Sequence, residues 1–163
     1  MRLMRRVARW VFRARSKRIK FSTAPMNARP RVVIDTNVWL SALVFGGKPR
    51  QVVELLARGM IEVVISSEIL TEMRRKITQK FSDFDPDFAL MELLIEQETE
   101  LVRLGGVSVH VSRDEDDNRV LETAVIGGCS CIVSGDKDLL VLKSYEGINI
   151  MAPAEFLKVD LTP

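Results

Sequence analysis

The chain has 163 residues, of which 47% are hydrophobic and 28% are charged, a composition typical of one soluble globular domain. No apolar run reaches the ~18 residues that a membrane-spanning helix needs, and arginines interrupt any secretory signal, so we expect no integral membrane association. The net charge of +2 combines a basic first segment with an acidic remainder, because residues 1–31 contain 11 of the 24 basic residues and no acidic one.

The basic arm, residues 1–30, is the first predicted element. Its apolar residues recur at helical spacing between arginines, which predicts a partly helical, otherwise flexible segment. Such an arm suits contact with RNA phosphates or an anionic membrane surface, and an organelle transit peptide has a similar composition. The alternative is that translation begins at Met26, directly before the domain.

Short apolar runs alternate with helical patterns after the arm. Strands are predicted at residues 31–35, 61–65, 107–111, 131–133 and 148–150. Helices are predicted at residues 38–45, 49–58, 67–80, from 83–87 to Gly105, and at 118–126, 137–142 and 152–158. Continuously apolar strands that alternate with helices favour a three-layer α/β/α sandwich with a mainly parallel sheet of about five strands. The domain is expected to span residues 31–158, with a tail at 159–163.

Cys129 and Cys131 lie in and beside the fourth predicted strand, one residue apart. That spacing rarely allows a strain-free disulfide, and two cysteines are too few for a structural zinc site. We therefore expect both thiols to be reduced in a cytoplasmic protein.

Carboxylates follow nearly every predicted strand. They are Asp35, Glu72 on the helix after the second strand, Asp114, Glu115, Asp116, Asp117, Asp136 and Asp138. The carboxyl ends of parallel strands share one edge, so these groups should converge there and repel one another unless a cation binds. Oxygen ligands without histidine or cysteine favour Mg²⁺ or Mn²⁺, which typically act on phosphate substrates.

Each carboxylate also has a local explanation. Asp35 could cap a helix, and Glu72 could be a solvated helix residue. Residues 114–117 could form an acidic helix entry, and Asp136 and Asp138 could stabilise the turn at Gly135. The metal-site hypothesis therefore depends on their shared location.

Four segments resemble, in order, the motifs of PIN-domain nucleases. They are residues 32–38 (Val-Val-Ile-Asp-Thr-Asn-Val), 66–72, 117–124 and 132–139. The resemblance covers about residues 31–157, and its third and fourth motifs look most like the subgroup described as the toxin of a toxin–antitoxin pair.

The resemblance implies the site residues and their roles. Mg²⁺ or Mn²⁺ would be held by Asp35, Glu72, Asp117 and Asp136, with Asn37, Asp116, Ser134 and Asp138 around them or as occasional ligands. The basic residues nearby that would contact the RNA backbone are Arg74, Arg75, Lys76, Arg113, Arg119 and Lys137, although a solvated surface charge is the alternative for each.

The resemblance also implies a reaction and partners. The reaction would be hydrolysis of an RNA phosphodiester bond by in-line attack of water, leaving a 5′-phosphate. The partners would be a second copy of the chain and a small antitoxin that reaches the acidic groove.

Two other functions compete with the nuclease. A haloacid-dehalogenase-like phosphatase would need a second aspartate two residues after Asp35, where this chain has Asn37. A non-catalytic RNA-binding or protein-interaction module would keep the fold without the chemistry. Divalent-metal binding that is abolished by Asp35→Asn would distinguish the nuclease from that module.

Overall fold

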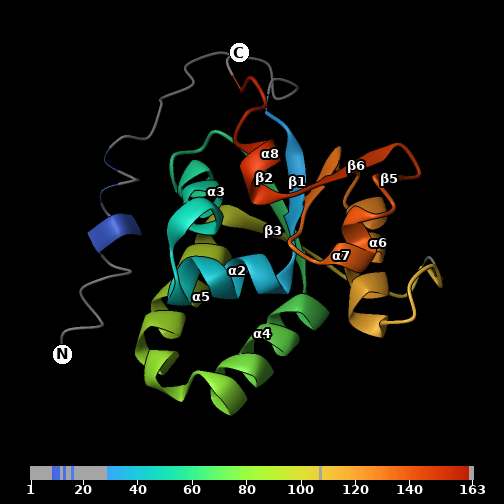
Figure 1. Ribbon diagram of the computed structural model, residues 1–163. Helices are drawn as coiled ribbons and strands as arrows, with labels where there is room; N and C mark the ends of the chain where they lie inside the picture. Colours follow the sequence, from blue (N-terminus) through green and yellow to red (C-terminus); the bar gives the residue numbers. More distant parts are fainter. Residues whose placement is uncertain (1–8, 12, 14–15, 17–28, 107, 162–163) are drawn as a thin grey trace.

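A six-stranded sheet forms the centre of the protein in the computed structural model, which describes residues 9–11, 13, 16, 29–106 and 108–161 (Figure 1). The strands are β1 (Arg31–Ile34), β2 (Glu62–Ser66), β3 (Thr99–Val102), β4 (Cys131–Val133), β5 (Ser144–Tyr145) and β6 (Ile148–Met151). Their order across the sheet is β3-β2-β1-β4-β6-β5, and all neighbours pair parallel except β5 and β6.

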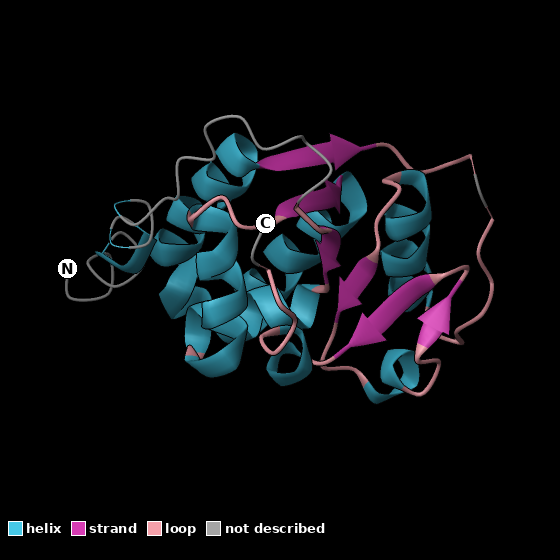
Figure 2. Ribbon diagram, turned by 90° about the horizontal axis from the view of Figure 1, so that it is seen from above, coloured by secondary structure: helices cyan, strands magenta, loops and turns pink. Residues whose placement is uncertain are grey.

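Helices cover both faces of this sheet (Figure 2). They are α2 (Thr36–Val44), α3 (Gly47–Ala57), α4 (Ser67–Lys80), η2 (Ser82–Phe84, a short 3-10 turn), α5 (Asp85–Glu98), α6 (Glu115–Ile126), α7 (Lys137–Leu140) and α8 (Pro153–Phe156). Helix α6 packs on β1, β2 and β4, whereas α2, α3, α5 and α8 pack together in the other layer. Helix α4 contacts both α2 and α6, so the predicted three-layer α/β/α sandwich is confirmed.

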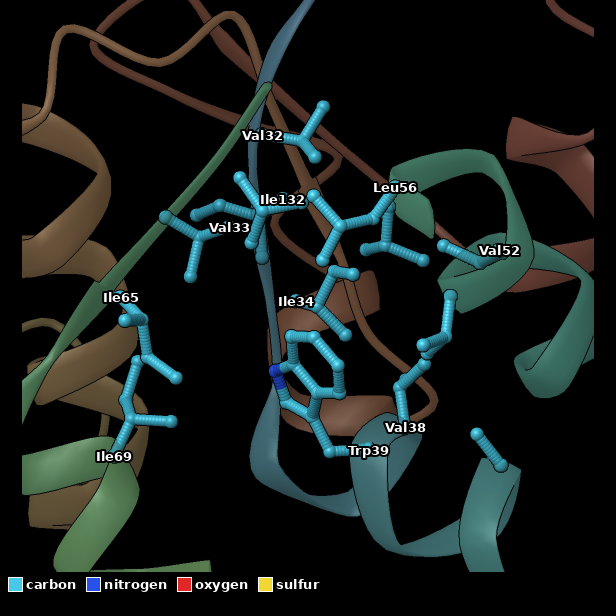
Figure 3. Packing of buried hydrophobic residues seen from close by; sticks show 14 of the residues in the cluster. Val32, Val33, Ile34, Val38, Trp39, Val52, Leu56, Ile65, Ile69 and Ile132 are labelled. Atoms are coloured by element: carbon cyan, nitrogen blue, oxygen red, sulfur yellow. The ribbon is translucent and has the colours of Figure 1, made fainter. Parts of the chain in front are cut away.

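Successive side chains of β1 point to opposite faces of the sheet and contribute to the hydrophobic core on both sides. Ile34 points toward Trp39 of α2 and Val32 toward Leu56 of α3, while Val33 points to the opposite side of the sheet (Figure 3). This arrangement follows from the two-residue period of a strand, and the apolar residues 32–34 of β1 therefore bury both of its faces. The strand that delivers Asp35 is held rigidly from both sides.

Helix α6 lies close to β2 because residue 127 is a glycine. A Cβ at Gly127 would stand 2.6 Å from Cγ1 of Val64 and 3.0 Å from the carbonyl oxygen of Thr123. A larger residue would push the end of α6 away from the sheet. The close approach supports the opposite end of α6, which carries Asp117.

The predicted third strand is wrong. The described residues 108–111 form no strand, and the sheet instead takes β3 from Thr99–Val102, which the apolar pattern had assigned to the preceding helix. The helix ends earlier because Thr99 has extended backbone angles and pairs in register with Val63 of β2. β3 is an edge strand with two exposed central residues, so it lacks the buried pattern on which the prediction relied.

The sixth strand, β5, was not predicted. It pairs antiparallel with β6 through a tight turn in which Glu146 and Gly147 both have positive φ angles, 48° and 80°. Two consecutive residues with positive φ favour a type I′ hairpin turn. A strand of two residues is too short to show alternation, so only this turn could have indicated it.

Three smaller expectations concern the cysteines, the membrane and the arm. Cys129 and Cys131 are buried and free, and burial raises the pKa of each thiol to about 12, which favours the unreactive protonated form. Within the described part of the chain, no helix is long and apolar enough to cross a membrane. The predicted helical arm falls mostly outside the described residues, but Trp10 is buried, and its ring lies 5.7 Å from the guanidinium carbon of Arg50.

Candidate metal centre

A hydroxyl between β1 and β4 positions two of the predicted acids. Asp35 follows β1 and Ser134 follows β4, and these strands pair side by side. The Ser134 hydroxyl donates to Oδ2 of Asp35 over 2.8 Å and accepts from the backbone N–H of Asp136 over 3.0 Å. Ser134 is fully buried, so it holds both acidic residues without competition from water.

Glu72 reaches the same region from helix α4. It is 8% exposed, and its Oε2 accepts a hydrogen bond of 2.7 Å from the hydroxyl of Thr36. Its Oε1 forms an ion pair with the ammonium group of Lys76, one turn further along the helix. That ammonium group also donates to Oδ1 of Asn37 over 3.0 Å. Lys76 thus links α4 to the start of α2.

Asp136 and two further carboxylates gather where α6 and α7 begin. One oxygen from each of Asp117, Asp136 and Asp138 lies within 4.8 Å of the other two. Asp117 is 7% exposed and accepts a hydrogen bond of 2.8 Å from the hydroxyl of Ser112. The loop that carries Ser112 is in turn held by Asn118, whose Oδ1 accepts from the backbone N–H of Ser112 over 2.9 Å.

The electrostatics reflect carboxylates that are held together out of water. Burial raises the pKa of Asp35 to about 6, the negative charges of Glu72 and Asp117 add to the rise, and the Ser134 hydrogen bond opposes it. Burial also raises the pKa of Asp117, with the charge of Asp136 adding to it and the hydrogen bond from Ser112 opposing it. Converging acids whose ionised forms are disfavoured in this way are typical of a site that binds a cation.

The local explanations fit some of these acids and not others. Asp35 occupies the position before α2, but its side chain caps no backbone N–H there. Asp114 does cap α6 by accepting from the N–H of Asp116, so part of the acidic run is a helix entry. Asp136 caps α7 by accepting from the N–H of Asp138 over 2.7 Å and also belongs to the carboxylate group.

The donor set fits a divalent cation. Among the described residues, the candidate ligands at the site are all oxygens, from carboxylates, hydroxyls or the Asn37 amide, and such hard ligands suit Mg²⁺ or Mn²⁺. The three oxygens that lie within 4.8 Å of one another are close enough to share one ion or its bound waters. Asp35 and Glu72 approach from β1 and α4, with Asp35 close enough for both Glu72 and Asp117 to affect its pKa.

The predicted basic residues divide into three groups. Arg74 is directed to Glu92 of α5, at 2.5 Å. Arg75 pairs with Asp116 beside the site, at 3.5 Å, and Arg119 lies 3.8 Å from Glu122. Lys76 pairs with Glu72, and the remaining two, Arg113 and Lys137, are exposed near the starts of α6 and α7.

Sequence reasoning missed the hydroxyls that orient the acids. Thr36 and Ser112 each donate to a predicted ligand, and neither stood out because serine and threonine are common beside helix starts. The pairing of Lys76 with Glu72 could have been found, because an acid four residues before a lysine on a helix is a recognised ion-pair spacing.

Comparison with known proteins identifies a family and a shared fold. A family model described as the PIN domain matches residues 31–138. MJ1680 of Methanocaldococcus jannaschii, named as an uncharacterised protein, is 31% identical over 140 residues, which cover 78% of this chain and 90% of that protein. A chain in the crystal structure of VapBC2 from Rickettsia felis, bound to a DNA fragment from their promoter, has 14% identity and a TM-score of 0.54, covering 75% of this chain and 98% of that one. It shares the fold. The family match, which spans more than half of the chain, shows that the chain belongs to the PIN domain family.

Proposed function

We propose that the protein is an endoribonuclease that hydrolyses RNA phosphodiester bonds with Mg²⁺ or Mn²⁺ held by Asp35, Glu72, Asp117 and Asp136. The observation that carries the proposal is the convergence of acids at the carboxyl ends of the sheet, with oxygens of Asp117, Asp136 and Asp138 within 4.8 Å of one another. Such a cluster is costly without a cation, and hard divalent cations at carboxylates commonly serve phosphoryl chemistry.

The residues have separate tasks in this proposal. When bound, the cation would neutralise charge on the phosphoryl oxygens and lower the pKa of water. Asp35 and Asp136 would be held in place by the Ser134 hydroxyl, and Asp117 by the Ser112 hydroxyl. Fixed carboxylates need no reorganisation when charge develops on the substrate, which favours the transition state.

The wider assembly is also part of the proposal. We take residues 31–158 as the catalytic domain of a cytoplasmic toxin that forms a homodimer and is inhibited by a small antitoxin protein. The resemblance of the third and fourth motifs supports this role, and the fold is shared with a chain of the VapBC2 structure. Arg75, Arg113, Arg119 and Lys137 are the proposed contacts to the RNA backbone.

Metal-dependent cleavage is the direct test. Purified protein with a labelled RNA should cleave it in Mg²⁺ or Mn²⁺ and not in EDTA. We expect Asp35→Asn and Asp117→Asn each to lose at least about 100-fold in rate, or about 2.7 kcal/mol of transition-state stabilisation. Asp83→Asn, which removes an exposed carboxylate at the far end of α4, should cleave normally. If the wild-type protein binds metal but does not cleave RNA, a binding module is supported instead. If it neither binds metal nor cleaves RNA, the metal site is rejected.

Replacing Lys76 should separate metal affinity from cleavage. The Lys76 ammonium neutralises Glu72 inside the cluster, so a cation must bind against its charge. We expect Lys76→Met to bind Mn²⁺ roughly tenfold more tightly in calorimetry, the change that about 1.4 kcal/mol of relieved repulsion gives. Cleavage should nevertheless fall, because Lys76 also orders Asn37. Lys80→Met, one turn further along the same helix and exposed, should change neither quantity. Weaker Mn²⁺ binding by Lys76→Met would contradict this account.

A further inference from the structure

A cavity of about 420 Å³ opens beside the carboxylates, on the side of α2 and α3. It is lined by Asn37, Val38, Ser41, Lys48, Pro49, Gly135, Asp136, Ala152, Pro153 and Ala154. Two of these residues, Asn37 and Asp136, also belong to the candidate metal centre, so the cavity and the centre are continuous. Its volume falls in the range of about 300–1,000 Å³ that is typical of small-molecule sites.

The walls of the cavity combine apolar surface with a few polar groups. Val38, Pro49, Ala152, Pro153 and Ala154 supply an apolar lining at the junction of α2, α3 and α8. This is the common composition of a site that takes a flat or partly apolar group and orients it with polar atoms at the edge.

The polar edge is suited to a phosphodiester strand. Asn37 already accepts from Lys76 through Oδ1, which leaves its NH₂ group as a donor. Lys48 lies in the first turn of α3, is exposed, and has no ion-pair partner in the described part of the chain. A positive charge at the N-terminal end of a helix is unfavourable, so Lys48 does not stabilise α3. Both the lysine and the N-terminal end of the helix attract an anion.

We propose that this cavity is a nucleotide subsite that holds the ribose and base next to the scissile phosphate, with Lys48 on the adjoining phosphate. The proposal rests on the ribonuclease function and adds a position of substrate recognition to it. A strand whose phosphate reaches Asp136 must pass along a surface that borders the metal centre, and the cavity provides such a surface. The base would lie against Val38 and Pro153 in the apolar part of the cavity.

The experiment fills the cavity without touching the carboxylates. Ala154 is exposed on α8 and lines the cavity, so Ala154→Trp should occupy the space and still fold, and Ala154→Leu occupies less of it. Lys158→Trp, an exposed position that does not line the cavity, is the matched control, and Lys48→Ala removes the phosphate contact. The measurements are kcat and KM on a labelled single-stranded RNA in saturating Mn²⁺, and Mn²⁺ affinity by calorimetry.

We expect Ala154→Trp to lower kcat/KM about tenfold, mainly through KM, with a smaller loss in Ala154→Leu and an unchanged Mn²⁺ affinity. Lys48→Ala should raise KM in the same direction and weaken its salt dependence. A substrate with an abasic nucleotide beside the cleaved bond should be cleaved less well by the wild-type protein, with little further loss in Ala154→Trp, because the two changes remove the same contact.

The outcomes separate the subsite from the ribonuclease function. If the wild-type protein cleaves RNA and both Ala154→Trp and the abasic substrate leave kcat/KM within twofold, the subsite is overturned and the function stands. A normal kcat/KM together with lost inhibition by a protein partner would assign the cavity to that partner instead. If the wild-type protein binds Mn²⁺ but cleaves no RNA, the function and the subsite fall together.

Discussion

Asp35→Asn should make the metal-free protein more stable at pH 7, by about 3 kcal/mol, while it abolishes cleavage. The pKa of Asp35 is raised to about 6 in the folded protein, from its ordinary value of 3.8, mainly by burial and then by the charges of Glu72 and Asp117. A difference of about 2 pKa units corresponds to about 3 kcal/mol of free energy. Asparagine can still accept the hydrogen bond from Ser134 and carries no charge that must be buried.

The direction in which the free energy of unfolding changes with pH follows from the raised pKa of Asp35. Because the folded pKa of Asp35 lies above the unfolded value, ionisation costs stability: the cost is absent below about pH 4, develops between about pH 4 and 6, and is complete above pH 6. The free energy of unfolding of wild-type protein in EDTA, measured by urea titration, should therefore fall as the pH rises through this window. The same curve should be flatter for Asp35→Asn.

Metal should reverse the ranking of the two proteins. A ligand at 1,000 times its dissociation constant stabilises the folded state by about 4.1 kcal/mol, which exceeds the advantage of metal-free Asp35→Asn, and only the wild-type protein should gain this in Mn²⁺. Asp83→Asn, which removes an exposed carboxylate outside the cluster, serves as the control for a general change of charge. Lower stability of metal-free Asp35→Asn at pH 7 would show that Asp35 holds the fold together rather than straining it.

Trp39→Ala should cost about 3–5 kcal/mol of unfolding free energy, the range for removing a fully buried large aromatic side chain. Trp39 of α2 is 0% exposed, and Ile34 of β1 points toward it (Figure 3). It lies one helical turn after Asp35, so the cavity left behind would also loosen the start of α2. We therefore expect weaker Mn²⁺ binding in whatever fraction of the variant remains folded.

Two further variants make the Trp39 experiment specific. The indole N–H of Trp39 is buried without a hydrogen-bond partner in the described part of the chain, so Trp39→Phe removes an unsatisfied donor and should cost much less than alanine. Val141→Ala, at a side chain that is 73% exposed, should change stability by no more than about 0.5 kcal/mol. Equal losses in Trp39→Phe and Trp39→Ala would mean that the donor has a partner after all.

Stability and the proposed function oppose each other at this site. The hydroxyls of Ser134 and Ser112 hold Asp35 and Asp117 in positions where burial disfavours their charges. Proteins retain such arrangements at functional sites although local substitutions would stabilise them. Packing of the core around Trp39 stabilises the fold enough to offset the cost of these buried carboxylates.

The amino-acid sequence by itself determined the layered fold and the location of the acids. Apolar strands such as residues 32–34 bury both faces, which requires a covered parallel sheet, and parallel strands bring their carboxyl ends to one edge. Asp35 and Asp136 follow paired neighbouring strands, so their proximity was predictable without any knowledge of side-chain contacts. The four motif segments pointed to the same residues.

Only the tertiary structure decided which segment completes the edge of the sheet and how each acid is oriented. Thr99–Val102 became β3 because β2 offered an unpaired edge at that position, a long-range demand that outweighed the local helical pattern. The hydrogen bonds from Ser112 to Asp117 and from Thr36 to Glu72 depend on where loops and helices meet. Periodicity reports which face of an element is buried, whereas hydrogen bonds between elements depend on their packing, and that packing is a property of the whole chain.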